Sequence, residues 1–208
     1  MIDTFSVCLH AHHIGGAGVN DKVAIIGAGP IGLGQLQLAR LSGADVLITD
    51  PVDSALAIAR ELGAAVTVSG PPERVAEQVM EFTGNRGADI VFECAGGESM
   101  PETLPLATKI VRRGGKVVVV GGFDDGEVAI PLEWQRIQMS EIQILPSASF
   151  ALHDIYPEQG TVLELLANGK LEAAKLITHR FTLDRINEAF EAAAAKEETG
   201  AVFVAITI

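Results

Sequence analysis

Residues 22–41 have the sequence KVAIIGAGPIGLGQLQLARL, and this stretch decides the fold. An apolar run leads directly into GAGPIG, and an amphipathic segment follows at once. In a strand, turn and helix of this kind, Gly27 makes the tight turn, Gly29 lets the backbone approach a pyrophosphate, and Gly32 lets the helix pack closely on the strand. The sequence therefore predicts the first unit of a dinucleotide-binding sheet.

β-Branched runs alternate with amphipathic stretches along most of the chain, which predicts a parallel sheet with helices on both faces. The expected strands are residues 22–27, 45–50, 65–70, 89–96, 116–122 and 141–148. The expected helices are residues 30–41, 54–62, 72–82 and 100–111, with stops at Gly43, Gly63 and Gly114. Short right-handed crossovers then give an α/β fold of the Rossmann type, a doubly wound six-stranded parallel sheet of order 3-2-1-4-5-6.

The chain of 208 residues has room for one full α/β domain and a short appendage. We expect a helix leading into the sheet within residues 1–20, the dinucleotide-binding domain within 21–182, and a helix and strand within 183–208. The final strand, AVFVAITI, is apolar and follows a complete sheet. We therefore expect that its pairing partner is not supplied by this chain.

Composition excludes several functions. The chain has 27 Asp and Glu against 15 Lys and Arg, a net charge of −12, and no basic run for nucleic acid or anionic lipid. It has no apolar run near the roughly 20 residues of a membrane span and no signal-peptide pattern, so a cytoplasmic location is expected. Cys8 and Cys94 lie outside any C-x-x-C pair and are expected to be reduced and structural.

Asp50 ends the second predicted strand, eighteen residues after Gly32. A carboxylate at this position accepts hydrogen bonds from ribose hydroxyls and repels the 2′-phosphate of NADP. The next three residues, 51–53, supply no cation to neutralise such a phosphate. NAD is therefore the expected cofactor, and the alternative is that Asp50 only caps the following helix.

Glycines also follow the fourth and fifth predicted strands, in CAGG (residues 94–97) and in GG (residues 121–122). Ligands of open α/β sheets lie beyond the carboxyl ends of strands, so we expect these turns to flank the cofactor. The alternative is that turns simply need glycine. No catalytic or metal-binding residue is predicted. The predicted cofactor-binding residues are Gly27, Gly29, Pro30, Ile31, Gly32, Asp50, Cys94, Ala95, Gly96, Val120, Gly121 and Gly122.

Over nearly its whole length the chain carries a series of segments: SVCLHA, KVAIIGAGPIG, ITDP, IARELGA, GADIVFECAGG, GGKVVVVGG, EIQILPS and LITHRFTLDRINEAFE. Together they resemble the coenzyme domain of the zinc-dependent medium-chain alcohol and polyol dehydrogenases, including sorbitol-, threonine- and butanediol-dehydrogenase-like members. The resemblance implies hydride transfer between NAD(P) and a small alcohol, polyol or ketone, with zinc polarising the alcohol oxygen. It also implies that the zinc-carrying GroES-like domain lies outside this sequence and that this chain alone binds NAD without turnover.

Asp3 falls, by this resemblance, where polyol dehydrogenases carry a glutamate near the zinc. One carboxylate cannot replace the three protein ligands of a catalytic zinc. His10, His12 and His13 cluster, and His12 lies four residues after Cys8. We interpret these imidazoles as lying on a solvated helix face, because no nearby acid completes a metal-binding set.

Two further expectations concern His179 and assembly. His179, in ITHRF, is interpreted as a structural hydrogen-bonding residue at a strand end. The family resemblance implies that EVAIPL, from Glu127 to Leu132, pairs with the same segment of a second copy and so forms a homodimer. The apolar residues Val128, Ile130 and Leu132 occupy every second position of this segment.

Three other classes of protein are weighed against the dehydrogenase. A zinc-free quinone-reductase-type enzyme fits GAGPIG with Asp50 less well. A short-chain dehydrogenase needs a Tyr-x-x-x-Lys pair, but the one tyrosine, Tyr156, is followed four residues later by Gly160. A non-catalytic module that senses NAD would use the same glycine-rich site and remains open.

Overall fold

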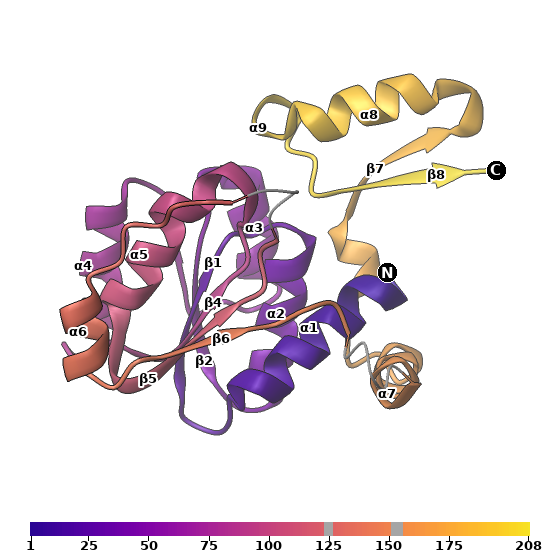
Figure 1. The fold of residues 1–208 in the computed structure, drawn as a ribbon. Helices are drawn as coiled ribbons and strands as arrows, with labels where there is room; N and C mark the ends of the chain where they lie inside the picture. Colours follow the sequence, from indigo (N-terminus) through magenta and orange to yellow (C-terminus); the bar gives the residue numbers. More distant parts are fainter. Residues whose placement is uncertain (123–126, 151–155) are drawn as a thin grey trace.

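The computed structural model describes residues 1–122, 127–150 and 156–208. Within these residues, six parallel strands form one sheet in the order β3-β2-β1-β4-β5-β6, which confirms the predicted doubly wound topology (Figure 1). The strands are β1 (Lys22–Ile26), β2 (Asp45–Thr49), β3 (Val66–Val68), β4 (Ala88–Glu93), β5 (Val111–Val119) and β6 (Gln143–Pro146).

Helices cover both faces of the sheet (Figure 1). One face carries α1 (Ile2–Gly15), α2 (Pro30–Leu41), α3 (Asp53–Glu61) and α7 (Tyr156–Ala167). The other carries α4 (Pro72–Phe82), α5 (Met100–Ile110) and α6 (Trp134–Met139), and the short η1 (Gly97–Ser99) precedes α5. Gly43 and Gly63 follow α2 and α3 with φ of 90° and 87°. Gly114 does not end a helix, because α5 stops at Ile110 and β5 begins at the next residue.

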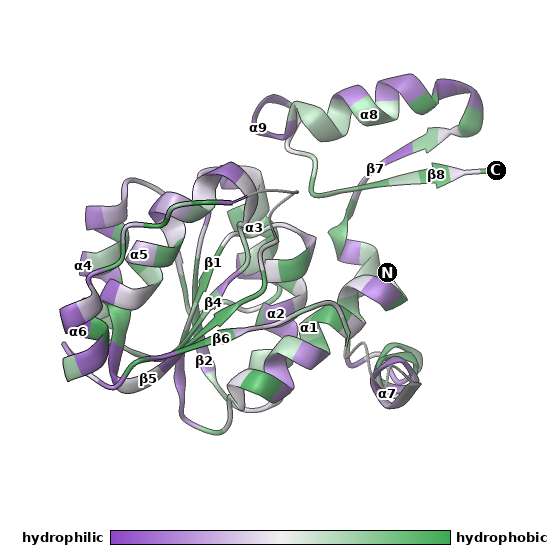
Figure 2. Ribbon diagram, in the orientation of Figure 1, coloured by the Kyte–Doolittle hydropathy of each residue, from purple (hydrophilic) through white to green (hydrophobic). Residues whose placement is uncertain are grey.

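Two hydrophobic cores lie on the two faces of this sheet. In β1, Val23 and Ile25 belong to one core, whereas Ala24 and Ile26 belong to the other. Successive side chains of a strand point to opposite faces, so a strand buried on both sides must be apolar throughout. Figure 2 shows hydrophobic strands between helices along which hydrophilic and hydrophobic residues alternate.

Of the three histidines of α1, only His13 is exposed as expected, whereas His10 is half-buried and His12 is buried. His12 is buried, with its Nε2 2.7 Å from Ser42 Oγ and its Nδ1 3.3 Å from Gln35 Nε2. The Nδ1 atoms of His10 and His13 lie 3.0 and 3.3 Å from Glu158 Oε1 of α7. The expectation that no acid lies near these imidazoles is wrong for His10 and His13, because Glu158 comes from a distant part of the chain.

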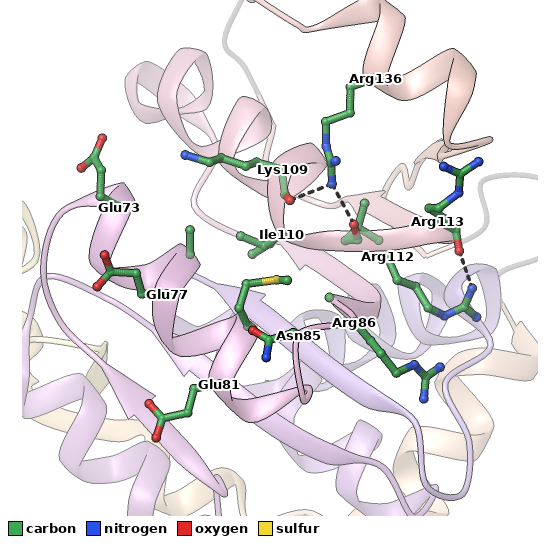
Figure 3. A pocket seen from close by; sticks show the side chains of 14 residues that line it. Glu73, Glu77, Glu81, Asn85, Arg86, Lys109, Ile110, Arg112, Arg113 and Arg136 are labelled. Carbon is green, nitrogen blue, oxygen red and sulfur yellow. Dashed lines mark hydrogen bonds between the residues drawn. The ribbon is translucent and has the colours of Figure 1, made fainter.

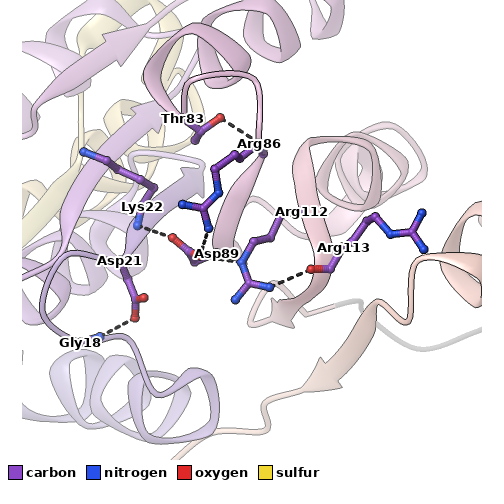
Figure 4. A network of polar contacts seen from close by, with 9 residues as sticks. Gly18, Asp21, Lys22, Thr83, Arg86, Asp89, Arg112 and Arg113 are labelled. Carbon is purple, nitrogen blue, oxygen red and sulfur yellow. Dashed lines mark hydrogen bonds and ion pairs between the residues drawn. The ribbon is translucent and has the colours of Figure 1, made fainter.

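Asp89 joins the amino ends of three strands (Figure 4). Its Oδ2 accepts a hydrogen bond from the Lys22 backbone N–H at 2.8 Å, and its Oδ1 accepts one from Arg112 Nε at 2.6 Å. The Arg86 guanidinium lies 3.8 Å away. Burial by itself raises the pKa of Asp89, but these partners together outweigh burial and hold that pKa below its ordinary value.

The C-terminal part forms a small unit beside the sheet (Figure 1). Its elements are η2 (Ala173–Leu176), β7 (Ile177–Thr182), η3 (Leu183–Arg185), α8 (Ile186–Ala194), α9 (Lys196–Thr199) and β8 (Phe203–Thr207). β8 pairs in parallel with β7, so the expectation that AVFVAITI lacks a partner in this chain is wrong. His179 lies within β7, and its Nδ1 is 3.0 Å from Thr178 Oγ1.

Among the described residues, no helix combines the length and the apolar character needed to cross a bilayer.

The pH dependence of stability should reveal the buried His12. Burial, with a smaller contribution from His13, lowers the pKa of His12 from 6.5 to about 4. The unfolded chain therefore takes up this proton before the folded chain does. The resulting contribution to stability is present above pH 6.5 and is lost as the pH falls toward 4, by about 3 kcal/mol in total.

Urea unfolding of wild type and His12→Gln, followed between about pH 7 and pH 4.5, measures this effect. Between these two pH values, the unfolding free energy of His12→Gln should fall by less than that of wild type. The unfolding free energy of a His179→Gln control should fall by as much as that of wild type. Equal losses for His12→Gln and wild type would contradict the assignment.

Candidate dinucleotide-binding site

The turn after β1 depends on two glycines that face each other. Gly27 has a φ of 99°, a left-handed conformation that side chains rarely adopt. A Cβ at Gly32, in the first turn of α2, would overlap the carbonyl oxygen of Gly27. The helix can therefore begin directly over the end of β1 only because Gly32 has no side chain.

The N-terminus of α2 is open for a ligand. Gly29 is its N-cap residue, Pro30 occupies the first turn, and no side chain caps the helix. A Cβ at Gly29 would have nothing within 4 Å, so the space beside this backbone is free. Uncapped N–H groups at the start of a helix, with the helix dipole behind them, form an anion site that needs no Lys or Arg.

Asp50 fastens this turn to the second strand. Its Oδ2 accepts a hydrogen bond from the Ala28 N–H at 2.7 Å, and its Oδ1 accepts one from the Val52 N–H at 2.8 Å. Val52 is the N-cap residue of α3, so the carboxylate also serves the start of the next helix. Asp50 therefore supports the start of α3, as the sequence alternative proposed. It also contacts the glycine turn, and the sequence did not predict that contact.

Glu93 was not singled out from the sequence, yet it holds two of the predicted loops together. This buried residue ends β4, and its Oε1 accepts hydrogen bonds from Ala95 N–H at 3.1 Å and Gly96 N–H at 3.0 Å. Its backbone carbonyl accepts bonds from Val120 and Gly121 N–H, both at 2.9 Å. The sequence feature that could have identified Glu93 is an acidic residue at the end of an apolar strand, directly before CAGG.

The predicted cofactor-binding residues come together at the carboxyl edge of the sheet. The Cys94 N–H donates to the Ile26 carbonyl at 2.8 Å, and a Cβ at Gly27 would lie 3.0 Å from Ala95 N. A Cβ at Gly96 would lie 2.8 Å from Gly121 Cα. The turns after β1, β4 and β5 thus form one continuous backbone surface, to which Asp50 is attached through Ala28.

Neither cysteine of the chain is poised as a nucleophile. Burial raises the pKa of the Cys8 thiol and of the Cys94 thiol well above the ordinary value. The Cys8 Sγ lies 3.2 Å from the carbonyl oxygen of Ile31. Both are free cysteines, and Cys8 is buried.

The described residues do not supply a zinc site. No three His, Cys, Asp or Glu side chains among them lie together as a metal-binding group. Asp3 is exposed in the first turn of α1.

A pocket of about 880 Å³ lies at the opposite, amino edge of the sheet (Figure 3). Glu73, Glu77 and Glu81 of α4 form one wall. Five of the fifteen Lys and Arg residues of the chain line the rest, although no basic run is visible in the sequence: Arg86, Lys109, Arg112, Arg113 and Arg136.

Several of these arginines are bound to the protein itself. Arg136 donates hydrogen bonds to three carbonyl oxygens at residues 108, 109 and 111, and Arg113 Nη2 donates to the Met139 carbonyl at 3.0 Å. The pocket is also separated from the glycine loops by the length of the strands. The carboxyl edge therefore remains the candidate site.

The sheet order, the glycine turn over β1 and the open N-terminus of α2 define a Rossmann-type dinucleotide-binding fold. A family model described as zinc-binding dehydrogenase matches residues 30–168, more than half of the chain. The chain therefore belongs to the zinc-binding dehydrogenase family.

Individual relatives agree with this membership. L-idonate 5-dehydrogenase of Vitis vinifera is 35% identical over 93% of this chain and 52% of its own length, and sorbitol dehydrogenase of Bacillus subtilis is 32% identical with the same coverages. The solved structure of a zinc-binding dehydrogenase of Sinorhizobium meliloti 1021, bound to NADP, has a TM-score of 0.82 at 29% identity and covers 99% of this chain and 58% of that chain. The chain spans about half the length of the curated relatives it matches.

Alanine substitutions at two glycines of the same turn should differ in their effect on the free energy of unfolding. Gly32→Ala places a methyl group against the Gly27 carbonyl, and such overpacking costs on the order of 1–3 kcal/mol of unfolding free energy. Gly29→Ala meets nothing within 4 Å at a φ of −70°, so its stability should stay close to that of wild type. Urea unfolding compares the three proteins, and equal stabilities would refute the packing role of Gly32.

Proposed function

We propose that this chain binds NAD(H) at the carboxyl edge of its sheet. The observation that carries the proposal is the backbone cradle at the start of α2, where Gly29 is open to a ligand and Gly32 brings the helix over β1. The pyrophosphate would be held by N–H groups of Gly29, Ile31 and Gly32. This mode of binding suits a chain with a net charge of −12, because it needs no cationic side chain.

Asp50 would then bind the adenosine ribose. Each of its carboxylate oxygens accepts one backbone hydrogen bond and keeps further acceptor capacity for a hydroxyl group. A 2′-phosphate would meet the same carboxylate as a like charge. This supports NAD(H) over NADP(H) as the cofactor.

The loops after β4 and β5 would enclose the remainder of the cofactor. Their glycines approach one another so closely that side chains at Gly96 or Gly121 would meet backbone atoms. Glu93 holds the first of these loops through Ala95 and Gly96 and the second through its carbonyl oxygen. The bound nicotinamide would supply hydride acceptance or donation, and these residues would position it.

We further propose that the complete protein is a zinc-type alcohol or polyol dehydrogenase that acts on a small alcohol, polyol or ketone. Family membership and the similarity to a sorbitol dehydrogenase and an L-idonate 5-dehydrogenase support this proposal. Residues 1–20 and 183–208 would join the sheet domain to a zinc-carrying part. Exposed apolar side chains on the C-terminal unit favour such a junction: Leu183 (56%), Ile186 (37%), Phe190 (71%) and Ile206 (38%).

A homodimer through residues 127–132 is also proposed. β6 forms an edge of the sheet among the described residues, and Val128 and the nearby Trp134 are 41% and 66% exposed. Ile130 and Leu132, in contrast, are partly buried against the second core. The side chain best placed to report on a two-fold contact is therefore Val128.

Nucleotide binding by the purified chain tests the cofactor proposal. Wild type should bind NADH at least tenfold more tightly than NADPH, which corresponds to about 1.4 kcal/mol. Gly29→Ala should fold normally and yet weaken NADH binding by about tenfold or more, because its methyl group occupies the space beside the pyrophosphate-binding backbone. Fluorescence titration measures both affinities. Undiminished NADH binding by Gly29→Ala would exclude this cradle.

Light scattering at micromolar concentration tests the dimer. Val128→Lys should give monomers of wild-type stability, because the charge replaces an exposed apolar side chain at the contact. Ile130→Lys should in addition lower stability, because Ile130 packs on the second core. A monomeric wild type, or a Val128→Lys protein that stays dimeric, would rule out this interface.

A further inference from the structure

A second pocket at the carboxyl edge brings together two distant parts of the chain. It has a volume of about 560 Å³ and is lined by residues 51–54, between β2 and the start of α3, and by residues 197–200 at the end of α9. The first of these segments directly follows Asp50 in the sequence. The pocket therefore adjoins the position proposed for the adenosine ribose.

The charges around this pocket have one sign. Its ionisable lining residues are Asp53, Glu197 and Glu198, and no Lys or Arg contributes to it. In the described part of the chain, none of these three carboxylates lies within 4 Å of a cationic side chain. Lys196 precedes them in α9 but does not line the pocket. Their negative field is thus not cancelled by an ion pair.

Contacts on both sides hold the two glutamates at this position. Gly200 has a φ of 70°, and a Cβ there would lie 2.8 Å from Ser54 Oγ, so the backbone passes close to the start of α3. Thr199 Oγ1 donates hydrogen bonds to the carbonyl oxygens of Ala192 at 2.8 Å and Ala195 at 3.0 Å, which tie α9 to α8. The acidic wall is therefore part of the folded structure.

We propose that Glu197 and Glu198 determine cofactor specificity together with Asp50 and Asp53. The inference rests on the proposed binding of NAD(H) and extends it. A 2′-phosphate would bring up to two negative charges beside several unpaired carboxylates, whereas a ribose hydroxyl brings none. Discrimination against NADP(H) is thus shared between the end of β2 and a helix near the C-terminal end of the chain.

The test compares the affinities of NADH and NADPH for wild type and for the double variant Glu197→Gln, Glu198→Gln. At low ionic strength, the variant should bind NADPH about fivefold more tightly than wild type does, with less than a twofold change for NADH. The gain should shrink in high salt, because the carboxylates are exposed and screened. Glu197→Lys, Glu198→Lys should shift the ratio further in the same direction.

A matched control removes two acidic charges far from this pocket. Glu77→Gln, Glu81→Gln changes exposed acids in the later turns of α4, toward the amino edge of the sheet, and should leave the NADH to NADPH ratio unchanged. An equal shift in this control would mean that net charge, and not the acidic wall, determines specificity, and would overturn the inference.

Failure of this inference can be distinguished from failure of the proposed function. If wild type binds neither nucleotide, the proposed function is wrong and the inference falls with it. If wild type binds NADH but both double variants at residues 197 and 198 keep the wild-type ratio and wild-type urea unfolding, the acidic wall has no role and the NAD(H) site stands.

Discussion

The close packing of α2 on the end of β1 is the constraint on which the rest of the structure depends. Because a side chain at Gly32 would meet the Gly27 carbonyl, the helix can start directly above the strand only with glycine at this position. The same approach aims the first N–H groups of α2 toward the carboxyl edge, where the loops after β4 and β5 also end. α2 then supports α1, since a Cβ at Gly34 would lie 2.6 Å from Cys8 Sγ. A short segment thus sets both the ligand cradle and one face of the core.

At the carboxyl edge of the sheet, the charge that a ligand meets is set by nearby groups and not by the net charge of the chain. In a chain of net charge −12, a site for a dinucleotide is formed from backbone N–H groups, and two carboxylates are used to hold the loops that carry them. Asp50 joins the glycine turn to α3, and Glu93 joins the loops after β4 and β5. Backbone donors reach both carboxylate oxygens of Asp50, whereas in buried Glu93 they reach Oε1 only. The acids of this site therefore determine geometry as well as charge.

The two edges of the sheet differ in chemistry for a related reason. At the amino edge, Asp89 and the arginines around it fix the ends of β1, β4 and β5 through side chains (Figure 4). At the carboxyl edge, the turns after β1, β4 and β5 approach one another largely through glycine backbone. Side chains in place of these glycines would fill the space that a ligand needs, whereas the strand ends at the amino edge can be held together by charged side chains. The pocket in Figure 3, which is lined by both acidic and basic side chains, lies toward this amino edge.

The sequence by itself determined the strand order, the glycine turn and the position of Asp50 at a strand end, because these follow from local periodicity and from conformations that only glycine adopts readily. It also indicated the family. The tertiary structure decided the pairing of β7 with β8, the contact of His10 with Glu158 and the approach of α9 to α3. Each of these joins residues separated by many positions, whose meeting depends on how helices pack across the sheet. No periodicity or spacing within a short segment carries that information, so these contacts could be read only from the folded chain.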